Sequence, residues 1–381
     1  MMRQLILATA LLMAGITTAA EVAKPPASVP DVQSLLPTRG EIHVLVDDIT
    51  GDGRLDLAFI SHSNNSVQVY NQVAPRRFEA LDQQAVTGFH PNDAIALPGA
   101  PKRYLINAEG ENTLRVVKAQ PDGRLELIAE RPQPAPRAST LFSWPGWELG
   151  LAVVPFSGKT LTLLRGFNPE TGDAKAAYQL VLGNEPKHVR LADINGDGID
   201  ELLLTARLSN EVWVIDYLGP DKEPAPRRLW SFERGWPRHV LPFDVDRNGT
   251  LDLLVPMAVR QEIVVLLNDG KGNFSQGKPV PYPGNSGIHV MTAGQDRDGT
   301  RYLLAGGSRA LVLYRELKDA PGGFENVMLP LATWPNWVEL KDIDGDGWLD
   351  AVAAIQGNAP SPVIYGPLWE TFTALVASKA N

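Results

Sequence analysis

The chain has 381 residues, of which 44% are hydrophobic and 21% charged, and this globular mixture excludes disorder as the main state. Its formal net charge of −9 argues against nucleic acid as the main partner. There is no cysteine, so disulfides, thiolate metal sites, cysteine nucleophiles and a lipid-modified cysteine are excluded. The 34 glycines and 31 prolines follow no Gly-X-Y period and instead indicate many turns.

The first 20 residues are typical of a secretory signal peptide. Arg3 supplies positive charge, an apolar run follows over residues 5–16, and small residues place cleavage near Ala20. A retained amino-terminal anchor is the alternative, although the run is short for a bilayer. We therefore expect a periplasmic or secreted protein whose mature chain has no integral membrane span. Residues 21–39, rich in proline, should form an extended lead-in.

A nine-residue pattern recurs along the chain, with oxygen-bearing side chains at positions one, three, five and nine and glycine at position six. It starts at Asp48, Asp193, Asp244 and Asp342, with a decayed copy at Gly294. Successive starts are separated by 145, 51, 50 and 48 residues. Because 145 is close to three repeats of 48, two units whose loops have lost the pattern should lie between the first two copies.

Alternating, β-branched segments predict one strand before each loop, a strand–turn–strand after it and a weaker fourth strand. Seven such units indicate an all-β, seven-bladed β-propeller of four-stranded blades, in preference to a linear solenoid, because no capping repeats are evident. The closing strand of the ring is either Val32–Leu36 or Thr371–Ala377. We expect blades at about residues 40–87, 88–134, 135–183, 184–235, 236–283, 284–332 and 333–381.

The recurring loop offers the oxygen-rich cage that Ca²⁺ prefers, with a backbone carbonyl at position seven and a sharp turn at glycine six. The loops lack the position-twelve glutamate of an EF-hand, and each should join the first and second strands of a blade. A metal-free Asp/Gly turn is the alternative. We expect about four Ca²⁺ ions per chain, held by Asp48, Thr50, Asp52, Arg54, Asp56, Asp193, Asn195, Asp197, Ile199, Glu201, Asp244, Asp246, Asn248, Thr250, Asp252, Asp342, Asp344, Asp346, Trp348 and Asp350.

Ligand chemistry ranks these sites. The Asp342 loop offers four carboxylates and should bind most tightly, whereas the Asp48 loop, with the hydroxyl of Thr50 in one place, should bind most weakly. The decayed copy has lost two anionic ligands. We therefore expect no stable ion there, despite Asp296 and Asp298.

These loops resemble the FG-GAP/VCBS repeat, which is found in integrin α-chain propellers and in many bacterial exported proteins. The resemblance extends from about residue 40 to the end and is strongest in units one, four, five and seven. It implies Ca²⁺ as a structural staple on the lower face of the propeller and a ligand on the upper face. It does not identify that ligand, because the fold serves many functions.

Four of the six histidines stand five residues before a motif start: His43, His188, His239 and His289, with Trp337 at this position in the seventh unit. The position should lie where the innermost strand begins, at the channel mouth opposite the Ca²⁺ loops. Packing against a neighbouring proline is the first interpretation, and a polar ligand-binding mouth or a transition-metal site are the others. We expect the histidines of successive blades to lie too far apart for all four to share one ion.

The sequence contains no nucleophile elbow, zinc-protease helix, P-loop or dinucleotide fingerprint. We therefore favour a module that binds a protein or carbohydrate partner over an enzyme. One alternative is a sugar-acting lyase or dehydratase in which His188 and His239 serve as acid and base. A further alternative is an assembly scaffold with no small-molecule site.

Overall fold

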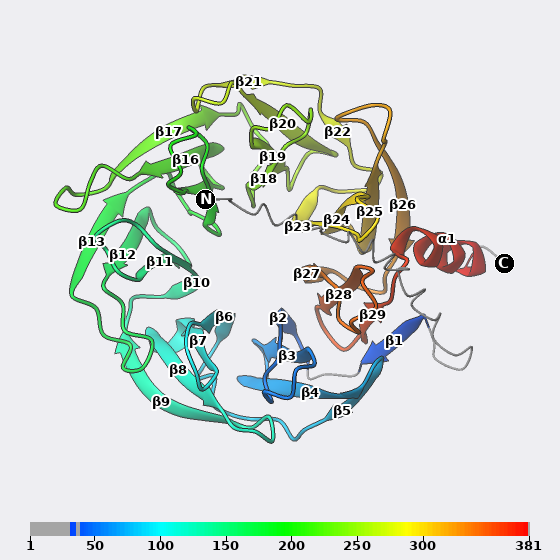
Figure 1. Cartoon of the computed structure of the whole chain (residues 1–381), viewed down its shortest axis with the longest axis horizontal. Coiled ribbons are helices and arrows are strands. Elements are labelled where there is room, and N and C mark those ends of the chain that lie inside the picture. Colours follow the sequence, from blue (N-terminus) through cyan, green and yellow to red (C-terminus); the bar gives the residue numbers. More distant parts are fainter. Residues whose placement is uncertain (1–30, 36–38, 380–381) are drawn as a thin grey trace, which may run out of the picture. The chain divides into compact units, whose positions relative to one another are not determined.

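The computed structural model describes residues 31–35 and 39–379. The expected signal peptide and most of the lead-in lie outside these residues. The described residues form 29 strands, one 3-10 helix and one α-helix, and the strands group into seven antiparallel sheets around a ring (Figure 1). This arrangement confirms the predicted all-β, seven-bladed propeller. In the described part of the chain, no helix has both the length and the apolar character needed to cross a bilayer.

Each of the first six blades is built from consecutive strands that run from the channel to the rim. Blade one contains β2 (Glu41–Asp47), β3 (Asp56–Ser61), β4 (Ser66–Ala74) and β5 (Arg77–Ala80). Blade two contains β6 (Pro91–Leu97), β7 (Arg103–Ala108), β8 (Thr113–Ala119) and β9 (Leu125–Pro132), with the 3-10 helix η1 (Glu109–Glu111) after β7. Blade three contains β10 (Pro136–Phe142), β11 (Gly150–Pro155), β12 (Thr160–Arg165) and β13 (Ala176–Val181).

The next three blades repeat this order. Blade four contains β14 (Arg190–Ala192), β15 (Glu201–Ala206), β16 (Glu211–Asp216) and β17 (Ala225–Ser231). Blade five contains β18 (Leu241–Phe243), β19 (Asp252–Pro256), β20 (Glu262–Asn268) and β21 (Phe274–Gln276), and β22 (Val280–Pro281) also pairs with β20. Blade six contains β23 (Ile288–Gln295), β24 (Arg301–Gly307), β25 (Ala310–Glu316) and β26 (Phe324–Pro330).

The seventh blade takes strands from both ends of the described chain. It contains β27 (Pro335–Lys341), β28 (Asp350–Ile355) and β29 (Ser361–Ile364), and its outer strand is β1 (Val32–Leu35). β1 pairs antiparallel with β29, from Val32 opposite Ile364 to Leu35 opposite Ser361. The first of the two candidate segments therefore closes the ring.

The other candidate, Thr371–Ala377, lies within the helix α1 (Leu368–Lys379), which packs beside β26 (Figure 1). Its buried residues Leu368, Thr371 and Phe372 are spaced three and four apart, as one face of a helix requires. The guanidinium of Arg315 lies over the ring of Trp369, 4.1 Å from its centroid. This segment therefore covers the outside of blade six instead of extending a sheet.

The hydrophobic core is divided into seven clusters in the described residues, one between each pair of neighbouring blades. The second strands β3, β15 and β28 are buried along their whole length, because each is covered on both faces by a neighbouring blade. Burying one large aliphatic side chain stabilises a fold by about 1.5–3 kcal/mol. Packing between blades therefore holds the ring, and the loops at its two ends remain available for function.

The turns divide between two faces. The lower face carries the turns between the first and second strands of each blade, such as the turn from Asp48 to Leu55. The upper face carries the turns between second and third strands, together with the segments that lead into the inner strands. The lower face therefore holds the repeated nine-residue loops, as predicted, and the upper face holds the start of every inner strand.

Replacing Leu35 by alanine should lower the free energy of unfolding by about 2–5 kcal/mol, because its side chain is 5% exposed and packs between blades seven and one. Ser34→Ala is the matched control, since this neighbouring side chain is exposed. Urea unfolding followed by circular dichroism measures both. Equal stability of the Leu35 variant and the parent would show that β1 does not help to close the ring.

Candidate functional site

Five of the seven inner strands contain one extra residue near their upper ends. In β2, Glu41 pairs with Ser61 and His43 pairs with Ile60, so Ile42 has no residue opposite it. The same register shift is present in β6, β10, β23 and β27. Such a bulge interrupts the alternation of side chains. Two consecutive residues of the strand therefore face the channel mouth.

Blades four and five contain the same irregularity just before their short inner strands. Pro186 forms an isolated bridge with Ala206, and the next paired residue is Arg190, opposite Leu203. Three residues on the inner side thus face two on the neighbouring strand. Blade five repeats this arrangement after its bridge at Pro237. All seven blades therefore place a bulge residue at the same height.

The bulge residues together line a pocket at the channel mouth: Ile42, Asn92, Arg137, Lys187, Arg238, His289 and Asn336. Its remaining lining comes from the next residue in blades four, five and seven, which is His188, His239 or Trp337. The pocket volume is about 50 Å³. Since one water needs about 10–15 Å³ by this measure, the pocket accepts one small polar group.

Blades three, four and five contribute three consecutive positive charges to this ring. Lys187 pairs with Glu185, which also pairs with Arg207. Arg137 and Arg238 make no ion pair with any residue that the structure describes. Burial and the nearby Arg137 lower the pKa of Lys187 to about 7, and burial also lowers that of Arg238 to about 10. Two of the three basic groups at the mouth, Arg137 and Arg238, therefore have no ion-pair partner among the described residues, whereas Lys187 is paired with Glu185.

Three of the predicted histidines gather around Trp337. Its ring centroid lies 4.4 Å from that of His43, 5.1 Å from His188 and 6.1 Å from His239. His188 and His239 stack on each other at 4.7 Å. The expectation that successive blades keep such residues many ångströms apart is wrong for His188 and His239, because each follows a bulge and turns toward the axis. Burial lowers the pKa of His43, and it lowers the pKa values of His188 and His239 well below the usual value. All three imidazoles are therefore neutral at pH 7.

His289 occupies a different position. It is the bulge residue of β23, between Ile288 opposite Gly307 and Val290 opposite Gly306. The sequence placed it level with His43, and this was wrong because β23 extends further toward the lower face, where the decayed loop is shorter. His289 stacks on Trp334 at 4.7 Å, and burial, with Arg238 nearby, lowers its pKa to about 4.

A second cavity of about 320 Å³ lies deeper in the channel, along the inner strands of blades one, two, three, four and seven. His188 and Trp337 line both cavities and therefore lie between them. His43 pairs with Asp93 through Nε2, with 3.2 Å to Oδ1, and Trp337 Nε1 donates to Glu339 Oε1 at 2.6 Å. The Nδ1 atoms of His43 and His239 are buried without a hydrogen-bond partner among the described residues.

Five exposed apolar side chains belong to blades two to five or to the segments that lead into them: Phe89, Phe156, Leu208, Trp236 and Val259. They lie on the turns and connections of the upper face. Phe156 lies under the guanidinium of Arg137, and Trp236, which is 43% exposed, lies under that of Arg207. Arginine beside exposed aromatic rings is typical of protein-binding surfaces.

On the lower face, the four complete loops share one geometry. The first aspartate accepts hydrogen bonds from backbone amides inside the loop, as Asp48 does from Gly51 at 2.7 Å and Gly53 at 3.0 Å. The residue at position nine is buried and accepts a hydrogen bond from the second residue of the loop, as Asp56 does from Ile49 at 2.9 Å. The glycine at position six has φ between 83° and 89° in every copy: Gly53, Gly198, Gly249 and Gly347.

The position-seven residues also behave alike, because each donates its backbone amide to the side chain at position five: Arg54 to Asp52, Ile199 to Asp197, Thr250 to Asn248 and Trp348 to Asp346. In two loops, carboxylate oxygens at positions one, three and nine converge to within 4.8 Å of one another: Asp244, Asp246 and Asp252, and Asp342, Asp344 and Asp350. In the other two loops position three is Thr50 or Asn195. Asn195 Nδ2 donates to Glu201 Oε1 at 2.7 Å.

A buried arginine from blade one reaches the loop of blade seven. The guanidinium of Arg76 pairs with Asp344 and Asp346, and with Asp346 the separation is 3.1 Å. Burial and the adjacent Asp344 raise the pKa of Asp350 to about 8 in the same loop. The sequence ranking of the loops did not include Arg76, because it lies 268 residues from Asp344. In the decayed loop, the carboxylate of Asp296 accepts a hydrogen bond from the backbone of Leu349 at 2.6 Å.

The comparisons with known proteins support this architecture. Residues 193–255, which include the loops at Asp193 and Asp244, match the model of the FG-GAP-like repeat. A search of curated protein sequences gives no match. The fold resembles that of BBS1N in complex with ARL6DN, soaked with mercury, at 10% identity and a TM-score of 0.61, covering 87% of this chain and 94% of that chain.

A second similar structure is a catalytically inactive histidine-to-alanine variant of virginiamycin B lyase from Staphylococcus aureus with quinupristin. It has 14% identity and a TM-score of 0.57, covering 87% of this chain and 98% of that chain. At these identities the likeness shows a common fold alone.

Proposed function

This chain is a β-propeller with FG-GAP-like repeats, and we propose that it binds a protein partner by capturing an acidic side chain at the mouth of its channel. The observation that carries the proposal is the set of three consecutive basic bulge residues, Arg137, Lys187 and Arg238, around a pocket of about 50 Å³. Guanidinium groups hold carboxylates by paired hydrogen bonds. The pocket volume suits one carboxylate and excludes a whole sugar ring.

The apolar residues around the mouth favour a protein over a carbohydrate. Phe156, Leu208, Trp236 and Val259 lie on the same blades as the basic residues, three to five, or on the segment that leads into blade five. A cationic pocket with an adjoining apolar rim matches a peptide segment that carries one acidic and several apolar side chains. BBS1N, a similar structure, is itself in complex with a protein, ARL6DN. The expected signal peptide would place this binding in the periplasm or outside the cell.

The geometry weighs against the sugar-acting enzyme. A general acid must be protonated at the working pH, whereas burial lowers the pKa of His188 and His239 well below the usual value. Their rings stack on each other and beside Trp337, and His239 is only 4% exposed. These side chains are held as the floor of a pocket, which suits binding better than proton transfer.

Arg238→Glu should weaken binding of a fluorescent peptide of glutamate and leucine residues by about tenfold or more, because it replaces an unpaired positive charge at the mouth with a negative one. Arg77→Glu is the matched control, since Arg77 is exposed on the outer strand β5. Fluorescence anisotropy measures both affinities, and polygalacturonate serves as the acidic carbohydrate competitor. Unchanged binding by the Arg238 variant, or preference for polygalacturonate, would contradict the proposal.

Binding of the acidic peptide should also weaken as the pH rises above about 7. The pKa of Lys187 is lowered to about 7, so the free protein loses this charge as the pH rises through neutrality. A bound carboxylate favours protonated Lys187, and binding therefore takes up a proton above pH 7 but not well below it. Lys187→Arg should remove this dependence between about pH 6 and pH 9, because arginine stays charged. Anisotropy titrations across this range provide the measurement.

We also propose that Ca²⁺ occupies the four complete loops as a structural ion of the lower face. Support comes from the convergence of carboxylate oxygens in the Asp244 and Asp342 loops and from the shared backbone turn of all four copies. A bound Ca²⁺ would supply positive charge between these oxygens. In the Asp342 loop, however, Arg76 already contributes one positive charge to Asp344 and Asp346.

Arg76→Gln should therefore raise the Ca²⁺ affinity of the Asp342 loop several-fold while the other three loops keep theirs. Calorimetric Ca²⁺ titration of the metal-free protein should give four ions for the parent and for this variant. Asp344→Ala should weaken one site in either background. A total of zero or one ion would refute the Ca²⁺ proposal, and an unchanged affinity in the Arg76 variant would refute the effect of arginine.

Chelation should lower the melting temperature, since Ca²⁺ binds only the folded loops.

A further inference from the structure

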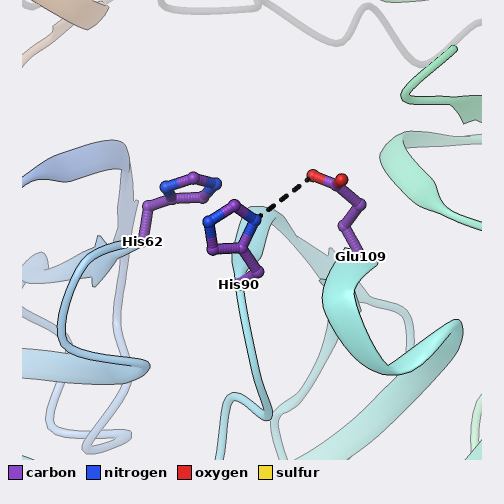
Figure 2. Close-up of side chains that lie close together, drawn as sticks. All are labelled: His62, His90 and Glu109. Carbon is purple, nitrogen blue, oxygen red and sulfur yellow. Dashed lines mark ion pairs between the residues drawn. The ribbon is translucent and has the colours of Figure 1, made fainter.

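Two of the six histidines are not at the channel, and the structure brings them together on the upper face. His62 lies in the turn between β3 and β4, and His90 lies just before β6 (Figure 2). Their ring centroids are 3.6 Å apart. Glu109, in η1 at the end of β7, extends toward His90, and its Oε2 lies 3.8 Å from His90 Nδ1. Blades one and two therefore place two imidazoles and a carboxylate side by side.

The three side chains offer one ligand atom each, and these atoms lie within 4.8 Å of one another. In a tetrahedral zinc site, metal–ligand distances of about 2.0–2.2 Å put ligand atoms about 3.4 Å apart. The three residues are partly exposed, so small rotamer changes bring them to this spacing. Two histidines and one glutamate also form an established set of zinc ligands that leaves a fourth position open.

Neighbouring residues hold this arrangement in place. The backbone of His90 has φ of 59°, in the left-handed region, and its amide donates to Asn65 Oδ1 at 2.8 Å. Asn92 Nδ2 donates to Glu109 Oε2 at 2.6 Å. Partners of this kind orient metal ligands and raise affinity. Asn92 is also the bulge residue of blade two, so the cluster adjoins the channel-mouth pocket.

We propose that His62, His90 and Glu109 bind one Zn²⁺ ion on the upper face. Imidazole and carboxylate ligands suit Zn²⁺, whereas the oxygen-only loops of the lower face suit Ca²⁺. With three protein ligands, the ion keeps one coordination position for water or for an anionic group at the mouth. The inference does not depend on the proposed partner or on Ca²⁺ in the loops.

The test uses untagged protein that is saturated with Ca²⁺ and free of transition metals. Calorimetric titration with Zn²⁺ should give one ion per chain, and Co²⁺ should give the visible absorption bands of a site with imidazole ligands. Loss of a residue that only orients a metal ligand can lower affinity about 100-fold. His90→Ala and Glu109→Gln each remove a direct ligand and should therefore lower the Zn²⁺ affinity by at least this factor. Asn92→Ala should lower it by about tenfold.

Glu111→Gln is the matched control, because Glu111 lies in the same helix η1 as Glu109 but pairs with Arg115 and lies outside the cluster. It should leave the Zn²⁺ affinity unchanged. Zn²⁺ should raise the melting temperature of the parent and the control but not of the His90 variant, whose melting temperature without metal should equal that of the parent. Absence of Zn²⁺ binding, or binding that survives both His90→Ala and Glu109→Gln but is lost in His188→Ala, would overturn the assignment.

Discussion

An inner strand of a propeller points only every second side chain toward the channel, and the bulge near its upper end changes this alternation. In five blades the bulge residue follows a proline: Pro91, Pro136, Pro186, Pro237 and Pro335. Proline lacks the amide that a regular ladder requires and is tolerated at bulges. Two layers of side chains result, the mouth pocket above and the ring of His43, His188, His239 and Trp337 below it.

The same scaffold therefore supports two faces of different character. On the lower face one loop design is repeated, with the same glycine conformation and the same amide-to-carboxylate bonds. On the upper face the bulge position varies from blade to blade, from the apolar Ile42 to the basic Arg238. The net charge of −9 conceals this division, because acidic side chains gather in the lower loops while the mouth is positive.

The blades could be predicted from the sequence because strand period, turn residues and loop spacing are local signals. The position of Trp337 beside three histidines could not be predicted from the sequence, since it depends on bulges that spacing alone does not reveal. Counting five residues back from the motif start gave the wrong strand position for His289, because blade six has a longer inner strand and a shorter loop. The basic residues Lys187 and Arg238 had a usable signal, since each stands between a proline and a histidine. Arg76 and the His62–His90 pair had none, because only the packing of neighbouring blades brings them to their partners.

The pairing of β1 with β29 has a consequence for how the chain reaches its folded state. The hydroxyl of Tyr365 and the side chain of Gln33 are hydrogen-bonded at 3.1 Å although 332 residues separate them. Contacts of such long range form slowly, because the entropy of closing the loop must be lost before they stabilise anything. During synthesis, blades one to six can stack before β27, β28 and β29 of blade seven have been made. Until then the chain is an open strip with an unpaired strand at its end, a state prone to join other chains edge to edge.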